Sequence, residues 1–402
     1  MKKLLSLKDA VFIGLAAMLG AGVFVVFGPA LDAAGTLLPL AIVIAAGVAY
    51  LNAKSISQLA AKVTRSGGAY SYARHYIGPA WGFLAGAAFM IGKIGSAAAI
   101  SLIFANYLTP DYPILTSVLA LALMAIVNSL GVNRTAFGST VLASITLVFL
   151  GLLIISSFFA PDSRAPVAPG TLGGALTASA LIFFAFAGYA RVATLGSEVS
   201  KSSKNVPLAI NISLGIVLLI YLSLGFLALN KLGGDGVGSL TPLRDLAAIS
   251  LPEPWSDWVF VFAAVACLGS LLALLAGISR TAAIMAEDAE LPKILQTRLK
   301  NGAPWVAELM VALFAAVLVL SSGVVFSIGV SSFCVLTYYS IANFAAFRQP
   351  RSETDRPKVW NLIGLLLCLG IGVAVPFQAL VVGATLMLLA LLLRKLGSIR
   401  RN

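Results

Sequence analysis

Glycines interrupt two long apolar runs of this 402-residue sequence, at positions where a helix break would expose charged ends of the backbone. Gly20, Ala21 and Gly22 stand in the middle of the first run, and Gly188 stands in a later one. Glycine costs about 1 kcal/mol against alanine within a helix, so a central cluster favours a break. A break leaves free N–H groups at the start of a half-helix, where the positive dipole suits a carboxylate. The alternative is that these glycines only allow close helix packing.

Two basic residues lie within or beside apolar runs. Lys93 stands in the middle of one run, where a charged side chain is costly and by default functional. A buried amine can exchange protons, so Lys93 is a candidate for proton coupling, with a structural bond to broken-helix carbonyls as the alternative. Arg191 follows Gly188 and is expected to pair with Asp9 or Glu198 in a gate, or else to contact an acidic substrate.

The elements that position these residues are expected to be membrane-spanning helices. The chain is 60% hydrophobic and only 10% charged, against about 25% charged residues in a soluble domain. Long, nearly uncharged apolar runs predict an all-α integral membrane protein. Twelve segments qualify, at 11–33, 37–60, 82–107, 113–131, 138–160, 174–195, 207–230, 257–285, 304–322, 324–347, 358–375 and 377–394.

The distribution of basic residues predicts the orientation of these segments. Most of the 27 lysines and arginines fall between segments on the side of the N-terminus, and only Arg164, Lys231 and Arg244 fall on the other side. Basic loops face the cytoplasm, so both termini of this multi-pass protein are predicted to be cytoplasmic, in the cell membrane. The same rule explains the net charge of +12 without a nucleic-acid partner.

Few residues are suited to other kinds of chemistry. Three scattered cysteines and a single histidine, His75, provide no metal site, disulfide framework or catalytic triad. The sequence therefore predicts no enzyme, no catalytic residues, no metal and no cofactor. Among the acidic residues, Glu308 is expected at the membrane interface, and the run that contains Asp288 and Glu290 is expected on a solvated face.

The interrupted runs are the first and the sixth, which occupy matching positions in two halves of five segments. Interrupted segments at matching positions of two repeats indicate the binding site of a transporter. A channel is not favoured, because no repeated ring of pore residues is visible.

Several motifs resemble those of the amino acid–polyamine–organocation superfamily. The first run contains "LGAGVF", and the loop after the second contains "TRSGGAYSYARHYIGPAWGFLAG". The sixth run contains "FFAFAGY", and the chain continues after it to "GSEVSKSSKNVPLAI". Further along the chain stand "GISRTAAIMAEDAELPKIL", "NGAPWVA" and "TYYSIANFAAF". Together these pieces cover most of the chain in the order typical of that superfamily.

This resemblance implies an arrangement of about twelve helices. Segments 1–160 and 161–348 would form two inverted five-helix repeats with broken helices 1 and 6, and segment 349–402 would add two peripheral helices and a cytoplasmic tail. An amino acid substrate would lie at mid-membrane. The substrate-binding residues implied by the resemblance are Gly20, Ala21, Gly22, Val23, Phe184, Phe186, Ala187 and Gly188.

The resemblance also implies roles for these residues. The substrate carboxylate would meet N–H groups near Ala21 and Val23, its ammonium would meet carbonyls near Phe186, and Phe184 would cover it. Many members carry an acidic residue two positions after the glycine of the sixth helix, where this sequence has Ala190. We therefore expect neutral amino acids as substrates, with protons as the coupling ion. An exchanger and a non-accumulating sensor of the same fold are the alternatives.

Overall fold

The computed structural model describes residues 5–63, 65, 67–130, 136–193, 199–354 and 356–399. These residues form a helical protein, in which the one β feature described is a parallel bridge between Leu5 and Val199. Seven of the described helices are long and apolar enough to cross a membrane, and four shorter apolar helices accompany them. The composition-based prediction of a helical membrane protein is thereby confirmed.

The helices follow the apolar segments, and several connections between them contain short helices. Their bounds are α1 Leu7–Met18, η1 Ala21–Phe24, α2 Phe27–Ala34, η2 Gly35–Leu37, α3 Leu38–Ala60, α4 Ala69–Tyr76, α5 Pro79–Leu108, α6 Pro113–Ser129, α7 Ala136–Phe158, α8 Leu172–Phe186, η3 Ala187–Tyr189, α9 Ala190–Ala193, α10 Ser202–Leu227, η4 Ala228–Leu232, η5 Gly233–Gly236, α11 Pro242–Ser250, α12 Val259–Glu287, η6 Lys293–Gln296, α13 Trp305–Ser321, α14 Val324–Arg348, α15 Lys358–Val373 and α16 Phe377–Ile399.

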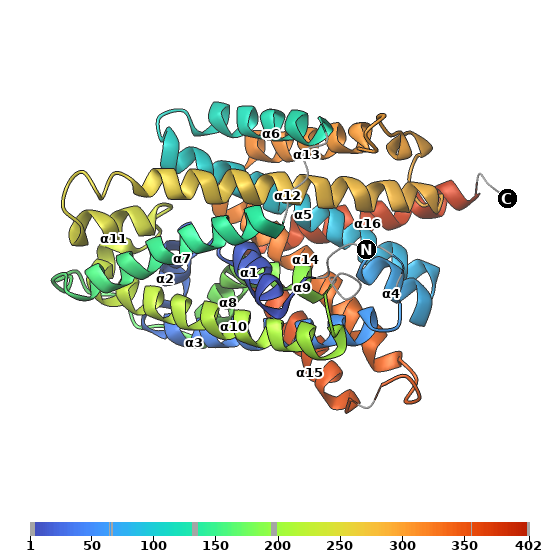
Figure 1. Ribbon diagram of the computed structural model, residues 1–402, viewed down its shortest axis with the longest axis horizontal. Coiled ribbons are helices and arrows are strands. Elements are labelled where there is room, and N and C mark those ends of the chain that lie inside the picture. Colours follow the sequence, from blue (N-terminus) through green and yellow to red (C-terminus); the bar gives the residue numbers. More distant parts are fainter. Residues whose placement is uncertain are drawn as a thin grey trace.

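The long helices run mainly along the longest axis of the molecule, with α4 at one end and α11 at the other (Figure 1). We call these the α4 end and the α11 end. All five tryptophans lie near the two ends, between 40% and 66% exposed. Trp81, Trp305 and Trp360 occupy the first turns of α5, α13 and α15 at the α4 end, whereas Trp255 and Trp258 precede α12 at the α11 end. Two tryptophan belts mark the two interfaces of a membrane.

The first and sixth apolar segments are both interrupted. The first consists of α1, the one-turn 3₁₀ helix η1 and α2, because Gly20 leaves the helical region with φ −81° and ψ −145°. Pro29 follows in the first turn of α2, where its missing N–H removes no helical bond. The sixth segment consists of α8, η3 and α9.

Small residues set the distance between the helices around these breaks. The α5 helix packs against α14 and α12, α8 against α2 and α3, and α1 against α10. A side chain at Gly95 would come within 3.1 Å of the backbone nitrogen of Ser331, and the hydroxyls of Ser96 and Ser331 are 2.6 Å apart. The contact between α5 and α14 is therefore close and partly polar, as is usual for helices that pack within a membrane.

Candidate functional site

The two interrupted segments meet at their breaks. A Cβ atom on Gly22 would stand 2.6 Å from the Cα atom of Ala185, and one on Gly188 would collide with the carbonyl oxygen of Ala17. Both glycines are therefore required for the approach of two backbones, which supports the close-packing interpretation. Because both glycines lie in the one-turn helices that interrupt their segments, packing and helix breaking occur together at one crossing.

Gly20 makes room for a third element at this crossing. A Cβ atom there would collide with the hydroxyl oxygen of Ser270, which lies on α12. The first break, the sixth segment and α12 therefore meet within a few ångströms. Ser270 brings a hydroxyl group directly to the point where the backbone of the first segment leaves the helix.

Two tyrosines satisfy carbonyl groups that the breaks leave free. The Tyr221 hydroxyl, from α10, donates to the carbonyl oxygen of Met18 at 2.7 Å and to that of Ala185 at 3.3 Å. The Tyr107 hydroxyl, from α5, donates to the carbonyl oxygen of Phe24 at 2.7 Å. Sequence reasoning missed both residues; the only available signal was a tyrosine within an otherwise apolar run. A carbonyl inside a membrane needs such a partner, so these contacts stabilise the broken conformation.

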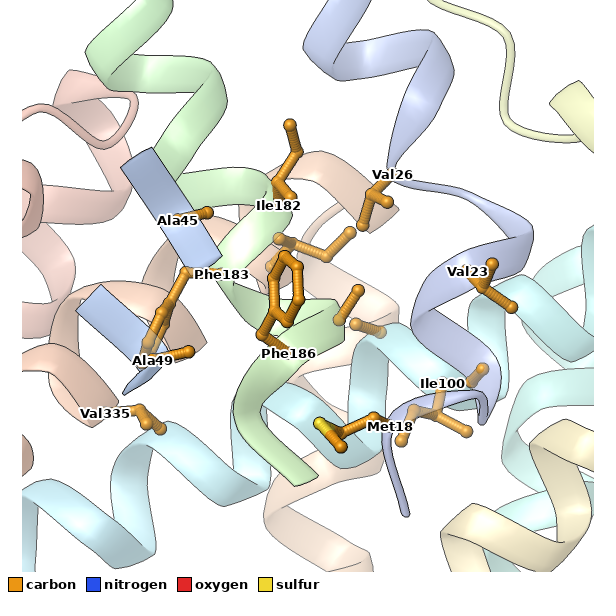
Figure 2. Close-up of a cluster of buried hydrophobic side chains, with 14 of the residues drawn as sticks. Met18, Val23, Val26, Ala45, Ala49, Ile100, Ile182, Phe183, Phe186 and Val335 are labelled. Carbon is orange, nitrogen blue, oxygen red and sulfur yellow. The ribbon is translucent and has the colours of Figure 1, made fainter. Parts of the chain in front are cut away.

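The N–H groups at the start of η1 remain as the candidate anion site. A 3₁₀ helix provides no partner for its first N–H groups, here those of Ala21 and Gly22. Figure 2 shows the apolar side chains around them, with Phe186 between the two segments and Met18 beside Ile100 of α5. Val23, Phe183 and Phe186 are fully buried. The crossing is thus enclosed by hydrocarbon in this conformation.

The crossing is sealed more firmly toward the α11 end. There the amide of Gly238 donates to the carbonyl of Gly28 in α2 at 3.1 Å, and the amide of Thr36 donates to the carbonyl of Ala168 at 3.2 Å. Toward the α4 end, by contrast, Ala17 and Gly188 are partly exposed. In this conformation the α4 side of the crossing is therefore the less tightly closed of the two.

The remaining substrate-site candidates lie along the sixth segment. Phe186 is fully buried with its ring centroid 4.8 Å from that of Tyr221, whereas Phe184 is only partly buried against the core. Ala187 lies in η3 and is partly exposed. Of the two phenylalanines, Phe186 is therefore the one at the crossing.

Lys93 lies in the middle of α5 and is partly exposed. Residues four and seven apart share a helix face, so Lys93 faces the same way as Phe89 and Ile100. Ile100 belongs to the same buried hydrophobic cluster as Met18 and Val23 of the first segment (Figure 2). Lys93 is therefore on the face of α5 that is turned toward the crossing, about two turns closer to the α4 end.

The three gate candidates are only partly described. Arg191 is exposed in α9. Asp9 forms a capping box with Ser6 at the start of α1, with an Oγ–Oδ2 distance of 2.7 Å. Glu198 lies outside the described residues. Asp9 therefore has a capping role in α1, and the gate stays a prediction.

Glu308 lies in the first turn of α13, one turn after Trp305, but it is buried within the protein. The residue is 2% exposed, and its carboxylate accepts from the Asn128 amide at 2.6 Å and the Ser279 hydroxyl at 2.8 Å. Asn128 belongs to α6 and Ser279 to α12, so α6, α12 and α13 meet at one buried polar contact. The sequence pattern around α13 gave no sign of partners so far apart in the chain.

The expected solvated position is right for Glu287, which is exposed, but wrong for Asp288 and Glu290. Asp288 pairs with Arg65 and accepts from the Tyr70 hydroxyl at 2.6 Å, and Glu290 pairs with Arg74 at 2.9 Å and Arg394 at 2.8 Å. Burial works to raise the pKa of both carboxyls, but these partners outweigh it and hold each pKa below its usual value. The loop after α12 is thereby tied to α4 and α16.

A second buried polar group links α3, α14 and α15. The amide of Asn343 donates to Asn52 at 2.7 Å, the Ser55 hydroxyl donates to Asn343 at 2.6 Å, and the amide of Asn361 donates to Ser55 at 2.8 Å. These residues are at most 4% exposed. Among the described residues, no cluster of histidine, cysteine or acidic side chains could hold a metal ion.

Comparison with known proteins agrees with this geometry. The family model for amino acid permeases matches residues 9–348. An uncharacterized transporter of Mycobacterium tuberculosis is 37% identical over 395 residues, covering 96% of this chain and 89% of the relative. Cationic amino acid transporter 5 of Arabidopsis thaliana is 24% identical, covering 92% and 69%. The branched-chain amino acid permease BcaP of Bacillus subtilis is 23% identical, covering 76% and 72%.

Proposed function

The chain belongs to the amino acid permease family, within the amino acid–polyamine–organocation superfamily of transporters, and we propose that it is a proton-coupled symporter of neutral amino acids. The observation that carries the proposal is the crossing of two broken segments at Gly22 and Gly188. It brings the free N–H groups of η1 next to the end of α8, within an apolar enclosure. That combination suits the two charged groups and the side chain of an amino acid.

In the proposed complex, the substrate carboxylate accepts from the amides of Ala21 and Gly22, aided by the dipole of η1. The ammonium group donates to carbonyls near Phe186 and Ala187, where α8 ends. Binding of the substrate then requires η1 and the end of α8 to keep their positions relative to each other. Phe186 and Val23 contribute the hydrocarbon surface for the substrate side chain.

Two related halves, 1–160 and 161–348, are the proposed basis of alternating access, with 349–402 peripheral. The packing of the helices supports two related halves, because equivalent helices make equivalent contacts with the other half. The second segment (α3) packs on the sixth (α8), and its counterpart, the seventh segment (α10), packs on the first (α1). Likewise α5 packs on α13, as α12 packs on α6. The short helices α4 and α11 also follow the second and seventh segments, respectively. In a transporter with such halves, the two ends open in turn around one fixed site.

The preference for neutral substrates rests on the side chains near the crossing. Ala190 stands at the start of α9, and the apolar residues Val23, Phe183 and Phe186 are fully buried near the crossing. A cationic substrate would bring a charge into this enclosure without a carboxylate to pair with it, which is strongly unfavourable. One relative is named for branched-chain amino acids, consistent with an apolar site.

Lys93 is the proposed proton-coupling residue, and a gate of Arg191 with Asp9 or Glu198 is proposed at the α4 end. Lys93 is the basic group on the face of α5 turned toward the crossing. Gain or loss of a proton by its amine there changes the electrostatic potential at the proposed substrate site. The α4 end is proposed to face the cytoplasm, in agreement with the positive-inside rule.

The test is uptake of labelled neutral amino acids into sodium-free proteoliposomes, with and without an inward proton gradient. Accumulation that requires the gradient supports the proposal. In that case Lys93→Ala is expected to abolish gradient-driven accumulation and to spare exchange, whereas the surface variant Lys300→Ala leaves both unchanged. Gradient-driven accumulation by Lys93→Ala at the normal level would contradict the role of Lys93.

Two other outcomes distinguish the alternatives. Uptake that needs only internal amino acid and ignores the proton gradient identifies an exchanger. Saturable binding without any uptake identifies a sensor. In both cases the crossing remains the binding site, and substrate-protected labelling at Ala21→Cys provides an independent check of that site.

A further inference from the structure

A hollow of about 350 Å³ at the α4 end is lined largely by basic side chains. Its walls come from the connection between α14 and α15, namely Arg351, Thr354, Arg356, Pro357 and Lys358. Within the described part of the chain, none of these three cations forms an ion pair with a carboxylate. Asp355, in the same connection, lies outside that part. The hollow therefore gathers positive charge that its described walls do not neutralise.

Arg356 is held in place by the neighbouring helix α3. Its guanidinium donates to the carbonyl oxygen of Lys54 at 2.5 Å, and its amide donates to the Thr354 hydroxyl at 3.3 Å. The first bond uses one of the five guanidinium N–H groups. Arg356 is thus an oriented donor rather than a freely moving surface charge.

The hollow opens where the lipid-facing surfaces of two helices begin. Val359 and Trp360, directly after Lys358, are more than half exposed in the first turn of α15. On the other side, the ammonium of Lys54 lies 5.0 Å from the ring centroid of the exposed Tyr50. Trp360 also belongs to the tryptophan belt of the α4 end. These residues place the hollow at the level of lipid headgroups, beside hydrocarbon-facing surface.

We propose that this hollow binds the phosphate group of an anionic phospholipid. Arginine matches the geometry of phosphate with paired N–H groups, and lysine adds a point charge. Lys358 begins α15, so the positive end of that helix dipole also faces the hollow. Basic pockets between helices at the cytoplasmic face bind anionic headgroups. The acyl chains would lie along the exposed faces of α3 and α15, and a zwitterionic lipid would bind more weakly because it carries no net charge.

The test uses the full-length protein in detergent micelles, with lipid retention followed by native mass spectrometry. Phosphatidylglycerol and phosphatidylcholine are titrated separately into the protein and into Arg351→Gln/Lys358→Gln. This variant keeps Arg356 and its bond to α3. The matched control is Lys293→Gln/Lys300→Gln, which removes two charges from the loop after α12, outside the hollow. Thermal unfolding confirms that each variant is folded.

Each basic residue near an anionic surface strengthens lipid attraction about fivefold, so the double variant is expected to bind phosphatidylglycerol about 30-fold more weakly. The control and the phosphatidylcholine titration should change little. Equal loss in both variants, or no loss in either, would overturn the site. A third arm adds inorganic phosphate: complete displacement of the lipid at millimolar phosphate would assign the hollow to a soluble anion and refute the lipid. None of these readouts involves an amino acid, so they are independent of transport.

Discussion

At the scale of single residues, the glycines at the crossing have two roles at once. Gly22 and Gly188 lie within the one-turn helices η1 and η3, which interrupt their segments, and both also allow two backbones to touch. The sequence favoured a helix break at these glycines and left close helix packing as an alternative. The structure shows that the glycines serve both purposes. A residue larger than glycine at either position must displace backbone rather than a flexible side chain.

Gly22→Ala is therefore expected to lower both stability and transport. The added Cβ would stand 2.6 Å from the Cα atom of Ala185, and overpacking of this kind typically costs about 1–3 kcal/mol. Thermal unfolding and proteoliposome uptake measure the two effects. The control is Gly277→Ala on α12, where a Cβ would meet nothing within 4 Å. If Gly22→Ala behaved like Gly277→Ala, the crossing would not be tightly packed.

At the scale of elements, polar contacts fix helices whose apolar surfaces alone would not choose a position. Van der Waals packing in lipid has little directionality, whereas hydrogen bonds between buried amides define which turns face each other. Asn343 of α14 holds α3 through Asn52 and Ser55. At the α4 end, Asp288 and Glu290 tie the end of α12 to α4 and α16.

Asn343→Ala is expected to destabilise the protein by about 1–3 kcal/mol. The substitution leaves the buried groups of Asn52 and Ser55 without their shared partner, and unsatisfied buried polar groups carry that cost. Thermal unfolding in detergent measures the change. Thr337→Ala on the same helix, whose hydroxyl donates only to the Phe333 carbonyl within α14, serves as the control. Equal effects of the two substitutions would argue against a role of Asn343 between helices.

Acid is expected to weaken the ion pairs at the α4 end. The pKa values of Asp288 and Glu290 are lowered by their arginine partners. A carboxyl with a lower pKa in the folded protein adds stability above its unfolded value, about pH 4, and loses it as the pH falls further. The unfolding temperature should therefore drop below about pH 4, and Asp288→Asn/Glu290→Gln should flatten that part of the profile. An unchanged profile in the double variant would contradict this assignment.

At the scale of the whole molecule, the two ends differ in how they close over the crossing. Backbone hydrogen bonds from the connections at 168 and 238 seal α2 at the α11 end. At the α4 end, Ala17 and Gly188 retain partial exposure. A transporter that alternates between two open states would have to break the α11-end contacts to bind substrate from that side.

Cysteine accessibility measures which end is open. In oriented vesicles, Ala17→Cys is expected to react with a membrane-impermeant maleimide applied from the α4 end, and much more slowly from the α11 end. The parent protein is the control, since Cys267, Cys334 and Cys368 are buried. Faster labelling from the α11 end would show that the described conformation is not the dominant one.

The sequence by itself determined the features that depend on local composition. Apolar runs and glycines within them predicted membrane helices and the location of the interruptions at Gly20 and Gly188, because hydrophobic length and backbone freedom are properties of a short segment. Only the tertiary structure revealed the partners across the fold. Tyr221 reaches Met18, Asn128 reaches Glu308, and Arg394 reaches Glu290 from far along the chain. Such contacts depend on which helix faces meet, and nearly uniform apolar helices carry too little pattern to specify those faces.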